Sequence, residues 1–505
     1  MTAASAPSGP LRAGRRPRPA AWRLLRLELR RATMLRILPL LGVLLAATEL
    51  RNDLGHAPLW PVRSTVVQYQ MELIGAVVAG VAAWTAGRDR RRDLTDLVTA
   101  TARPRWARQL ASLAAVTAWA ILLYAASVAA VFVVTSRQAT WGGPIWWLPG
   151  VGAAAIVAFS AVGFAFGAFF PGRFTAPLVV AGAVLAPQVG VLALQRHQSW
   201  GLVSPAEDAT VPGTGIFFPF HAGLSIVQIT FLAGLTAVAL GILAVPAAAG
   251  GLWLRRAGAM IALAGLAAAC TGVALAGTAR QQAQGIIVPA LHTAASDTLI
   301  TYSPACDNSS AVPVCLHPAY RATLPALEAA LDPVLSQVSG LPGAPVRVKL
   351  GQASAQQVSG QVVGGNAVTV GGHGVTIGGS PPVLYLSPTL LLGLETCPKT
   401  DCFTIADFTH GLGQDAAVTI IHTVIYGRPT PARPVPSPAQ QAIAAALIRL
   451  SGARVPAGPG VRQAGSGVSA AARRFAALPA GARRAWLAAH LGALRAGRIT
   501  LAEIP

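Results

Sequence analysis

The chain has 505 residues, of which 53% are hydrophobic and only 11% are charged, and its mean hydropathy is +0.55. Soluble domains carry roughly 25% charged residues, so the composition excludes a wholly soluble protein. The formal net charge of +21 would fit a nucleic-acid partner, but the positive residues lie largely between long apolar runs, which excludes that partner. Nearly all of them are arginine in an Ala-, Gly- and Pro-rich chain, which is typical of a high-GC bacterial genome.

Seven apolar runs, all before residue 280, are candidates to cross a bilayer, which takes about 20 residues in a helix. The first is the poorest, because Arg36, Pro39 and Glu49 lie within it. The sequence therefore predicts an α-helical polytopic membrane bundle. We expect its spans at residues 35–50, 66–86, 110–135, 146–170, 174–194, 224–249 and 258–277.

The arginines outside these runs predict the orientation of the bundle. Nineteen lie in the N-terminal segment, the loop at 87–108 and two shorter segments, whereas four lie in the alternate loops. Lys and Arg accumulate in cytoplasmic loops, so we expect a multi-pass protein of the plasma membrane with a cytoplasmic N-terminus. Seven spans then place residues 279–505 outside the cytoplasm.

Two different segments precede the first run. Residues 1–20 are rich in Pro, Ala, Arg and Ser without an apolar period, so we expect disorder. Residues 21–34 mix Leu with Arg, which is typical of an amphipathic helix on the inner membrane surface. A cleavable signal peptide is the alternative interpretation, but the basic leader of more than thirty residues is too long for one.

The cysteines give an independent indication of topology. Cys270 lies inside the last run, and the other four all follow residue 279. An even set on the predicted exterior fits disulfides, and the short separations favour Cys306–Cys315 and Cys397–Cys402, although four cysteines allow three pairings. A zinc site is the alternative, but Cys-x2-Cys spacing is absent.

The chain after residue 279 has ordinary globular patterning, and we expect a mixed α/β domain there. Residues 279–428 contain a predicted helix, Pro318 to Val338, and predicted strands at 346–350 and 383–386. The Gly-rich stretch 359–380 suggests further short strands. A helix from about Ile405 to Tyr426 leads to a Pro-rich linker, residues 429–438. Residues 439–505 form a helical end, with helices expected at about 439–451, 468–478 and 480–496.

Catalytic motifs are absent from the sequence. Neither Lys349 nor Lys399 lies in a P-loop, and His-Glu-x-x-His and Gly-x-Ser-x-Gly do not occur. His410 and His422, near Asp407 and Asp415, would lie some 120° apart on one helix, because each residue turns about 100°. We therefore expect no enzyme activity in this chain, no catalytic residues, no metal and no cofactor.

Polar side chains inside the spans are the candidates for a transport site. Glu72 is the acidic residue well within a span, and an intramembrane carboxylate is costly and often functional. Glu72, Gln188 and Gln228 form the candidate intramembrane polar site, although a structural role is the alternative for each, and for the glutamines a bond between helices. Gly163-x3-Gly167 favours close helix packing.

The loop after the second expected span, TAGRDRRRDLTDLVTATARPRWAR at 85–108, carries a resemblance. It resembles the corresponding loop of ATP-binding-cassette (ABC) exporter permeases of the drug, antibiotic and polysaccharide export class. There, an acidic and basic stretch, a short helix and a basic residue lead into the third span. The amphipathic segment before the first span resembles the elbow helix of that family. The resemblance covers residues 20–250, and the last span and outer domain are additions to its six-span plan.

This resemblance implies a partner. In such permeases the loop helix docks on a cytoplasmic ATPase subunit that powers transport, and two permease subunits, identical or different, pair in the bilayer. The implied docking residues here are Asp93, Asp96, Leu97, Val98, Arg103 and Arg105. The alternative for the loop is a basic segment held by anionic lipid. The alternative for the chain is a membrane-anchored receptor, adaptor or hydrolase that acts through the C-terminal domain.

Overall fold

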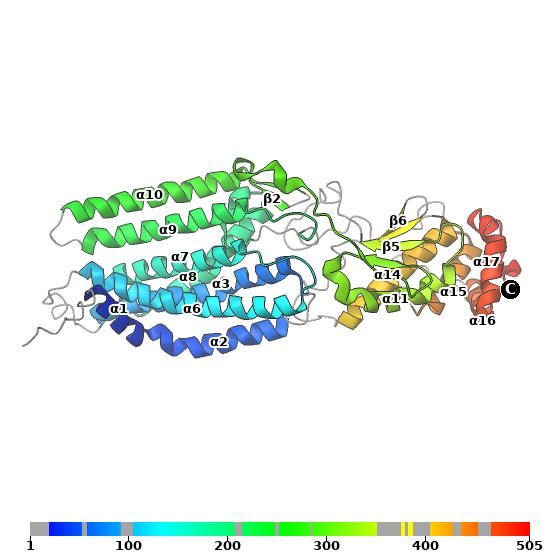
Figure 1. Ribbon diagram of the computed structural model, residues 1–505, viewed down its shortest axis with the longest axis horizontal. Helices are drawn as coiled ribbons and strands as arrows, with labels where there is room; N and C mark the ends of the chain where they lie inside the picture. Colours follow the sequence, from blue (N-terminus) through cyan, green and yellow to red (C-terminus); the bar gives the residue numbers. More distant parts are fainter. Residues whose placement is uncertain are drawn as a thin grey trace, which may run out of the picture.

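The computed structural model describes residues 20–52, 58–91, 105–207, 215–247, 252–282, 285–350, 375–378, 382–386, 405–427, 436–452 and 466–505. The molecule is elongated, with a helical bundle at one end and the described part of residues 300–505, called here the C-terminal region, at the other (Figure 1). We call the end of the bundle beside the C-terminal region the near end and the opposite end the far end.

Six helices among the described residues have the length and composition of membrane spans: α3 (Trp60–Ala86), α6 (Arg105–Gln138), α7 (Trp147–Phe169), α8 (Thr175–Gln195), α9 (Gly223–Ala247) and α10 (Leu252–Gly277). They run along the long axis of the molecule (Figure 1). The chain is therefore a multi-pass membrane protein, and these six correspond to the last six apolar runs of the sequence.

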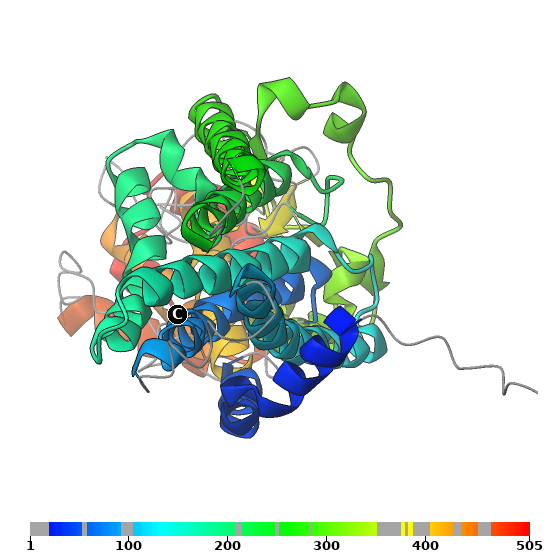
Figure 2. The ribbon, with the colours of Figure 1, turned by 90° about the vertical axis from the view of Figure 1, so that its left-hand side faces the viewer.

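The first expected span differs from the others. It lies in α2 (Thr33–Asn52), which meets the criteria for a span only together with α1 (Ala20–Arg31), and the two are bent by 51°. Arg36 and Pro39 within α2 lower its apolar character. Seen along the long axis, α1 runs across the far end, and α2 lies on the side opposite α9 and α10 (Figure 2). Among the described residues the bundle has six candidate spans, or seven if α1 and α2 together cross the membrane.

Small residues set the close packing of the bundle. A Cβ atom on Gly163 of α7 would lie 2.3 Å from the carbonyl oxygen of Ala79 in α3, and one on Gly167 would lie 2.1 Å from that of Ala83. The backbones of α3 and α7 are therefore in direct contact, as the Gly-x3-Gly spacing predicts. Three glycines of α10 spaced by seven residues, Gly258, Gly265 and Gly272, are likewise buried, and Gly265 meets Gly234 of α9.

The C-terminal region contains a five-stranded sheet in the order β3-β4-β5-β7-β6. Its strands are β3 (Ala305–Asp307), β4 (Val314–Leu316), β5 (Arg347–Leu350), β6 (Val375–Gly378) and β7 (Val383–Leu386). β5 pairs in parallel with β4 and β7, and β3 and β6 are antiparallel edges. The sequence predicted β5 and β7, but β3 and β4 are three residues long and carry too little alternation to be recognised.

Helices complete the C-terminal region. A short 3-10 helix (Pro318–Thr323) precedes α11 (Leu324–Val338), and α14 (Ile405–Tyr426) packs against α11. The helical end comprises α15 (Pro438–Leu450), α16 (Ser466–Ala477) and α17 (Ala480–Arg495). Ser437 and Gln440 form a capping box at the start of α15, which fixes where that helix begins. Most of residues 359–380 and of the Pro-rich linker lie outside the described residues.

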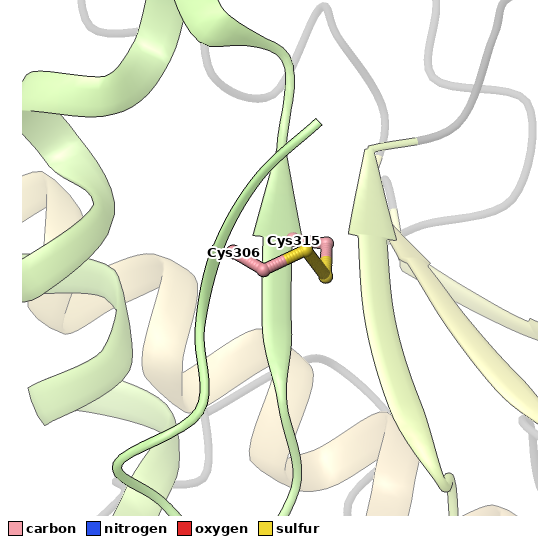
Figure 3. Close-up of a disulfide and its surroundings, with 2 residues drawn as sticks. All are labelled: Cys306 and Cys315. Atoms are coloured by element: carbon pink, nitrogen blue, oxygen red, sulfur yellow. A yellow bond between two sulfur atoms is a disulfide. The ribbon is translucent and has the colours of Figure 1, made fainter. Parts of the chain in front are cut away.

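The two expected disulfides have different outcomes. Cys306 and Cys315 are bonded, and they face each other in the register of the antiparallel pair β3–β4 (Figure 3). Cys397 and Cys402 lie outside the described residues. Cys270 is a free cysteine on α10, where its side chain is exposed on the bundle surface and not packed inside it.

Candidate functional site

Polar side chains are buried at the near end of the bundle, where the sequence of α3 is least apolar. Arg63, Ser64, Gln68 and Gln70 are all buried in the first three turns of this helix. Arg63 precedes the span expected at residues 66–86 and is one of the four arginines assigned to the alternate loops, but α3 begins at Trp60, with Pro61 in its first turn, and so includes it. Pro is favoured there because its missing N–H has no helical partner to lose.

A segment between α8 and α9 is inserted into this end. We call residues 199–207 the inserted segment; it begins with a 3-10 turn, Ser199–Val203, and residues 201–206 are buried. An irregular buried segment exposes carbonyl groups that need donors. Two glutamine side chains from the helices supply them.

The amide nitrogen of Gln228 in α9 donates to the carbonyl oxygens of Leu202, Ser204 and Glu207, at 3.2, 2.8 and 2.8 Å. That of Gln68 in α3 donates to Pro205 at 2.8 Å and to the same Glu207 carbonyl at 2.9 Å. The two helices are thus bridged through the backbone of the inserted segment. Gln228 was expected to bond between helices, and its partner is this segment instead.

Small residues let the inserted segment approach α8. A Cβ atom on Gly201 would lie 2.4 Å from the carbonyl oxygen of Gly190, and one on Gly190 would lie 2.5 Å from the Cβ of Ser204. The Ser204 hydroxyl is 3.4 Å from the carbonyl oxygen of Pro187. The inserted segment is therefore packed on α8 and bonded to α3 and α9, which closes the near end of the bundle.

Several buried polar atoms at the near end of the bundle have no hydrogen-bond partner within the part of the chain that is described. They are Oε1 of Gln68, both side-chain polar atoms of Gln70 and the hydroxyl of Ser225. Burying such groups without partners is unfavourable by about 1–3 kcal/mol each. A polar ligand or water entering the near end could satisfy them.

The candidate intramembrane polar residues are only partly brought together. Glu72 is half-buried one helical turn from Gln68 and on the same side of α3, and Gln228 faces the same inserted segment as Gln68. Gln188 is exposed on α8 and lies outside this group, although its neighbour Pro187 contacts the inserted segment. The sequence did not predict that Gln68 holds the inserted segment, because the carbonyl groups to which it donates are 137 and 139 residues away.

The candidate docking loop connects α3 to α6 in the sequence, and α3 ends and α6 begins at the far end of the bundle (Figure 1). Asp93, Asp96, Leu97, Val98 and Arg103 fall outside the described residues, and so does the side chain of Arg105. The flanks of the loop are described. A short helix α4 (Arg88–Arg91) follows α3; there, Arg91 stacks on Trp84 at 4.0 Å and donates to the Trp84 carbonyl oxygen.

The amphipathic helix α1 contacts Arg88, just after α3, and the middle of α6. Arg88 lies 3.9 Å from the carboxylate of Glu28, and the indole N–H of Trp119, about four turns into α6, donates to the carbonyl oxygen of Leu29 at 2.9 Å. The ion pair is partly exposed and adds little stability. Together the two contacts connect α1 to the end of α3 and to α6.

An aromatic cluster links the near end to the C-terminal region. The ring of His317 lies 4.2 Å from that of Tyr302, 5.1 Å from that of Trp141 and 5.3 Å from that of Phe217, measured between ring centroids. Trp141 and Phe217 come from loops of the bundle. The N–H of Ile300 also donates to the Phe217 carbonyl oxygen at 2.8 Å.

His317 is neutral in this cluster. It has no exposed surface, and its Nδ1 accepts the N–H of Ala319 at 3.1 Å, which caps the 3-10 helix. Burial disfavours the charged ring and lowers the pKa of His317 to about 4. Loop residues Leu59, Ile216 and Phe217 share one hydrophobic core with Val314 and Leu316, so the C-terminal region is packed onto the bundle.

Comparison of the chain with models of known protein families, with curated proteins and with solved structures found no match.

Proposed function

We propose that this chain is the integral membrane permease subunit of an ABC-type exporter. It moves a substrate across the plasma membrane with energy from a separate cytoplasmic ATPase that docks on residues 88–105. α2 is the first of seven spans, the N-terminus is cytoplasmic and the C-terminal region is extracytoplasmic.

The observation that carries this proposal is the arrangement at the far end. Helix α1 contacts Arg88, at the start of the loop, and Trp119, about four turns into the helix α6 that follows the loop. A partner that pushes on the loop would therefore displace α3, α6 and α1 together. A lipid-held loop needs only its charge and has no need of this connection.

Two observations support the orientation. Arg173 lies between the end of α7 and the start of α8, and Arg255 and Arg256 are among the first five residues of α10. α10 begins at the far end, where α1 lies (Figure 1), and arginine accumulates on the cytoplasmic side. The disulfide Cys306–Cys315 lies in the C-terminal region at the opposite side, and disulfides persist in oxidising compartments outside the cytoplasm.

The near end supplies the candidate gate. The inserted segment closes it, and Gln68 and Gln228 hold that segment through hydrogen bonds that a small shift of α3 against α9 would break. Glu72, one turn deeper, would then face the path of a polar substrate. Coupling in this proposal runs from the loop along α3, which carries both Gln68 near one end and Trp84 near the other.

Co-purification tests the proposed partner. The chain would be isolated in mild detergent from its own host, and bound proteins identified by mass spectrometry, with an ATPase expected. Replacing Leu97 and Val98 by Asp should abolish its recovery, because each buried apolar side chain contributes roughly 1.5–3 kcal/mol. The matched double variant R90Q/R91Q changes charge in the same loop and should weaken recovery only partly.

Two outcomes contradict the proposal. If no ATPase accompanies the native chain, or if the two Asp substitutions leave its recovery unchanged, an anchored receptor, adaptor or hydrolase becomes the better explanation. Membrane insertion of each variant, measured by carbonate extraction, separates failed docking from failed folding.

Labelling of intact cells tests the orientation separately. Single cysteines introduced at Gln361 and at Arg91 are treated with a thiol reagent that does not cross the membrane. We expect labelling at position 361 only. Labelling at 91 and not at 361 would reverse the orientation.

A further inference from the structure

A cavity lies where α9 begins, outside the groups described above. Its volume is about 210 Å³, and its walls come from residues 220–226 and from residues 286–293, which include the end of β2 (Gly285–Ile287), the strand that pairs with β1 (Arg280–Gln282). Most of the residues that line it are apolar, with Phe220, Ile226 and Val288 among them. Two histidines, His221 and His292, also line it.

The hydrogen-bond roles of the two His292 nitrogens follow from its partner. Its Nε2 lies 3.0 Å from Oδ2 of Asp297. An ionised carboxylate only accepts hydrogen bonds, so Nε2 is the donor, and Nδ1 of the neutral ring has a lone pair. This Nδ1 is buried and has no hydrogen-bond partner in the described part of the chain. The same holds for Nε2 of His221, a residue that is only 8% exposed.

The spacing of the two rings fits a shared ligand. Their centroids are 5.5 Å apart. Two imidazoles bound to one tetrahedral zinc ion at about 2.0–2.1 Å would have centroids roughly 5 Å apart. A buried nitrogen that lacks a partner calls for an unseen water or ion, and here two such atoms belong to neighbouring rings on one cavity.

We propose that His221 and His292 bind a divalent cation of the zinc class, through Nε2 and Nδ1 respectively. Asp297 is a positioning residue, because its carboxylate orients the His292 ring, as carboxylates beside metal-bound histidines do. No group of three or more His, Cys, Asp and Glu side chains converges in the described ranges. Water or an incoming anion therefore fills the remaining positions, and the ion exchanges readily.

The ion would connect two parts of the molecule. His221 lies two residues before α9, and His292 lies in the chain that leads from α10 into the C-terminal region. Binding therefore clips the start of α9 to that chain, and anything that binds only the folded state stabilises it. This inference does not depend on an ATPase partner.

Zinc binding to the full chain tests the proposal. The protein is purified in detergent without a polyhistidine tag, carries Cys270→Ser to remove the free thiol, and is stripped with a chelator. Bound zinc is measured by atomic absorption after gel filtration, and affinity by competition with a chromophoric chelator. We expect one zinc per chain and a rise in Tm when zinc is added.

Variants locate the ion. The double variant H221Q/H292Q should bind no zinc and lose the zinc-dependent rise in Tm, and Asp297→Asn should weaken binding about 10–100-fold. His197→Asn is the matched control, because His197 is exposed and has a φ of 58°, a conformation that Asn tolerates. It should bind zinc as the parent does.

Each other result overturns the site. An absence of bound zinc at about a hundredfold excess over chain would mean that water alone fills the cavity. Unchanged binding by H221Q/H292Q or by Asp297→Asn would place the ion elsewhere. If the double variant elutes as an aggregate, Asp297→Asn, which keeps both rings, decides.

Discussion

In the C-terminal region the large apolar side chains point inward, and Leu331 and Leu335 of α11 have no exposed surface, whereas in α8 and α10 many of them point outward. Leu185 of α8 is 61% exposed and Leu263 of α10 is 62% exposed. The bundle also has an apolar core, with Met71, Ile74 and Phe164 buried in it, and its buried glycines bring helix backbones together. Apolar side chains thus point inward in the part of the chain that water surrounds, and many point outward in the part that lipid surrounds. Substitutions in the two parts should therefore differ in their effect on stability.

Shortening a buried leucine should have the largest effect. Leu335→Ala removes apolar burial and leaves a cavity, so we expect the free energy of unfolding to fall by about 2–5 kcal/mol. Leu185→Ala, on the lipid-facing surface of α8, should change it by less than about 0.5 kcal/mol. Thermal unfolding in detergent measures both. Equal losses would mean that the bundle buries α8 against another chain.

Replacing a glycine by a larger residue should destabilise the bundle where the glycine lies between two helices and have little effect where it is exposed. Gly163→Val puts a side chain against the carbonyl oxygen of Ala79, and overpacking of this kind destabilises by up to about 3 kcal/mol. Gly182→Val is the control, since a Cβ there meets nothing within 4 Å. The fraction of monodisperse protein after heating reports both. Tolerance of Gly163→Val would contradict the direct backbone contact of α3 with α7.

Acid should weaken the C-terminal region through His317. Its folded pKa of about 4 lies below the ordinary 6.5, so the unfolded state binds the proton more tightly. Stability is then full above pH 6.5, declines as the pH falls from 6.5 towards 4, and declines no further from this group below 4. The total loss should not exceed about 3 kcal/mol, at 1.36 kcal/mol for each pH unit.

His317→Asn provides the control for that titration. Asn keeps an acceptor for the Ala319 N–H and is a favourable N-cap, but it does not titrate in this range. In the parent chain, peptides covering residues 314–324 should lose protection from hydrogen exchange as the pH falls from 7 to 4, after correction for the intrinsic exchange rate. In the variant this loss of protection should be absent. An unchanged slope would assign the acid sensitivity to another group.

The disulfide belongs only to the C-terminal region. Replacing Cys306 and Cys315 by Ala should lower its stability by about 2–3 kcal/mol, because a short loop is released in the unfolded state. Bundle stability should stay as it is. Mass spectrometry of non-reduced peptides should find Cys306 joined to Cys315; free thiols at both would refute the bridge, and the same spectra test the predicted pair Cys397–Cys402.

The smallest expected effect concerns the clamp on the inserted segment. Gln228→Leu removes the donor to the Leu202 and Ser204 carbonyls, and leaving them buried without partners should cost about 1–2 kcal/mol. Gln188→Leu, exposed on α8, should be neutral or slightly stabilising. The rate of proteolysis within residues 199–207 measures how far the inserted segment is freed from the bundle. Equal rates for both variants would contradict the role of Gln228 in holding that segment.

Sequence predicted the elements whose signal is local. The apolar run at 146–170 became α7 at Trp147–Phe169, and the helix expected from Ile405 to Tyr426 has those bounds in α14. Such elements can be recognised from sequence, because their apolar pattern extends over consecutive residues. The proposed docking residues stay a prediction, since they lie outside the described residues.

The features that sequence did not predict depend on contacts between distant residues. The inserted segment has no periodicity of its own, and its position depends on Gln68 and Gln228. His221 and His292 are separated by all of α9 and α10, and neither lies in a ligand motif. Their meeting is a property of the folded bundle. Side-chain type alone marks these residues as polar and says nothing of which neighbours they find.

The shared core at the near end also has a consequence for biosynthesis. Leu59 and Phe217 pack with Val314 and Tyr320, which leave the ribosome much later. Until residue 320 has been made, the loops that carry Leu59 and Phe217 have no cover for their apolar side chains. This apolar surface of the bundle therefore stays uncovered until β4 and the residues up to 320 have been synthesised. A chain truncated before β4 would expose a patch that favours aggregation.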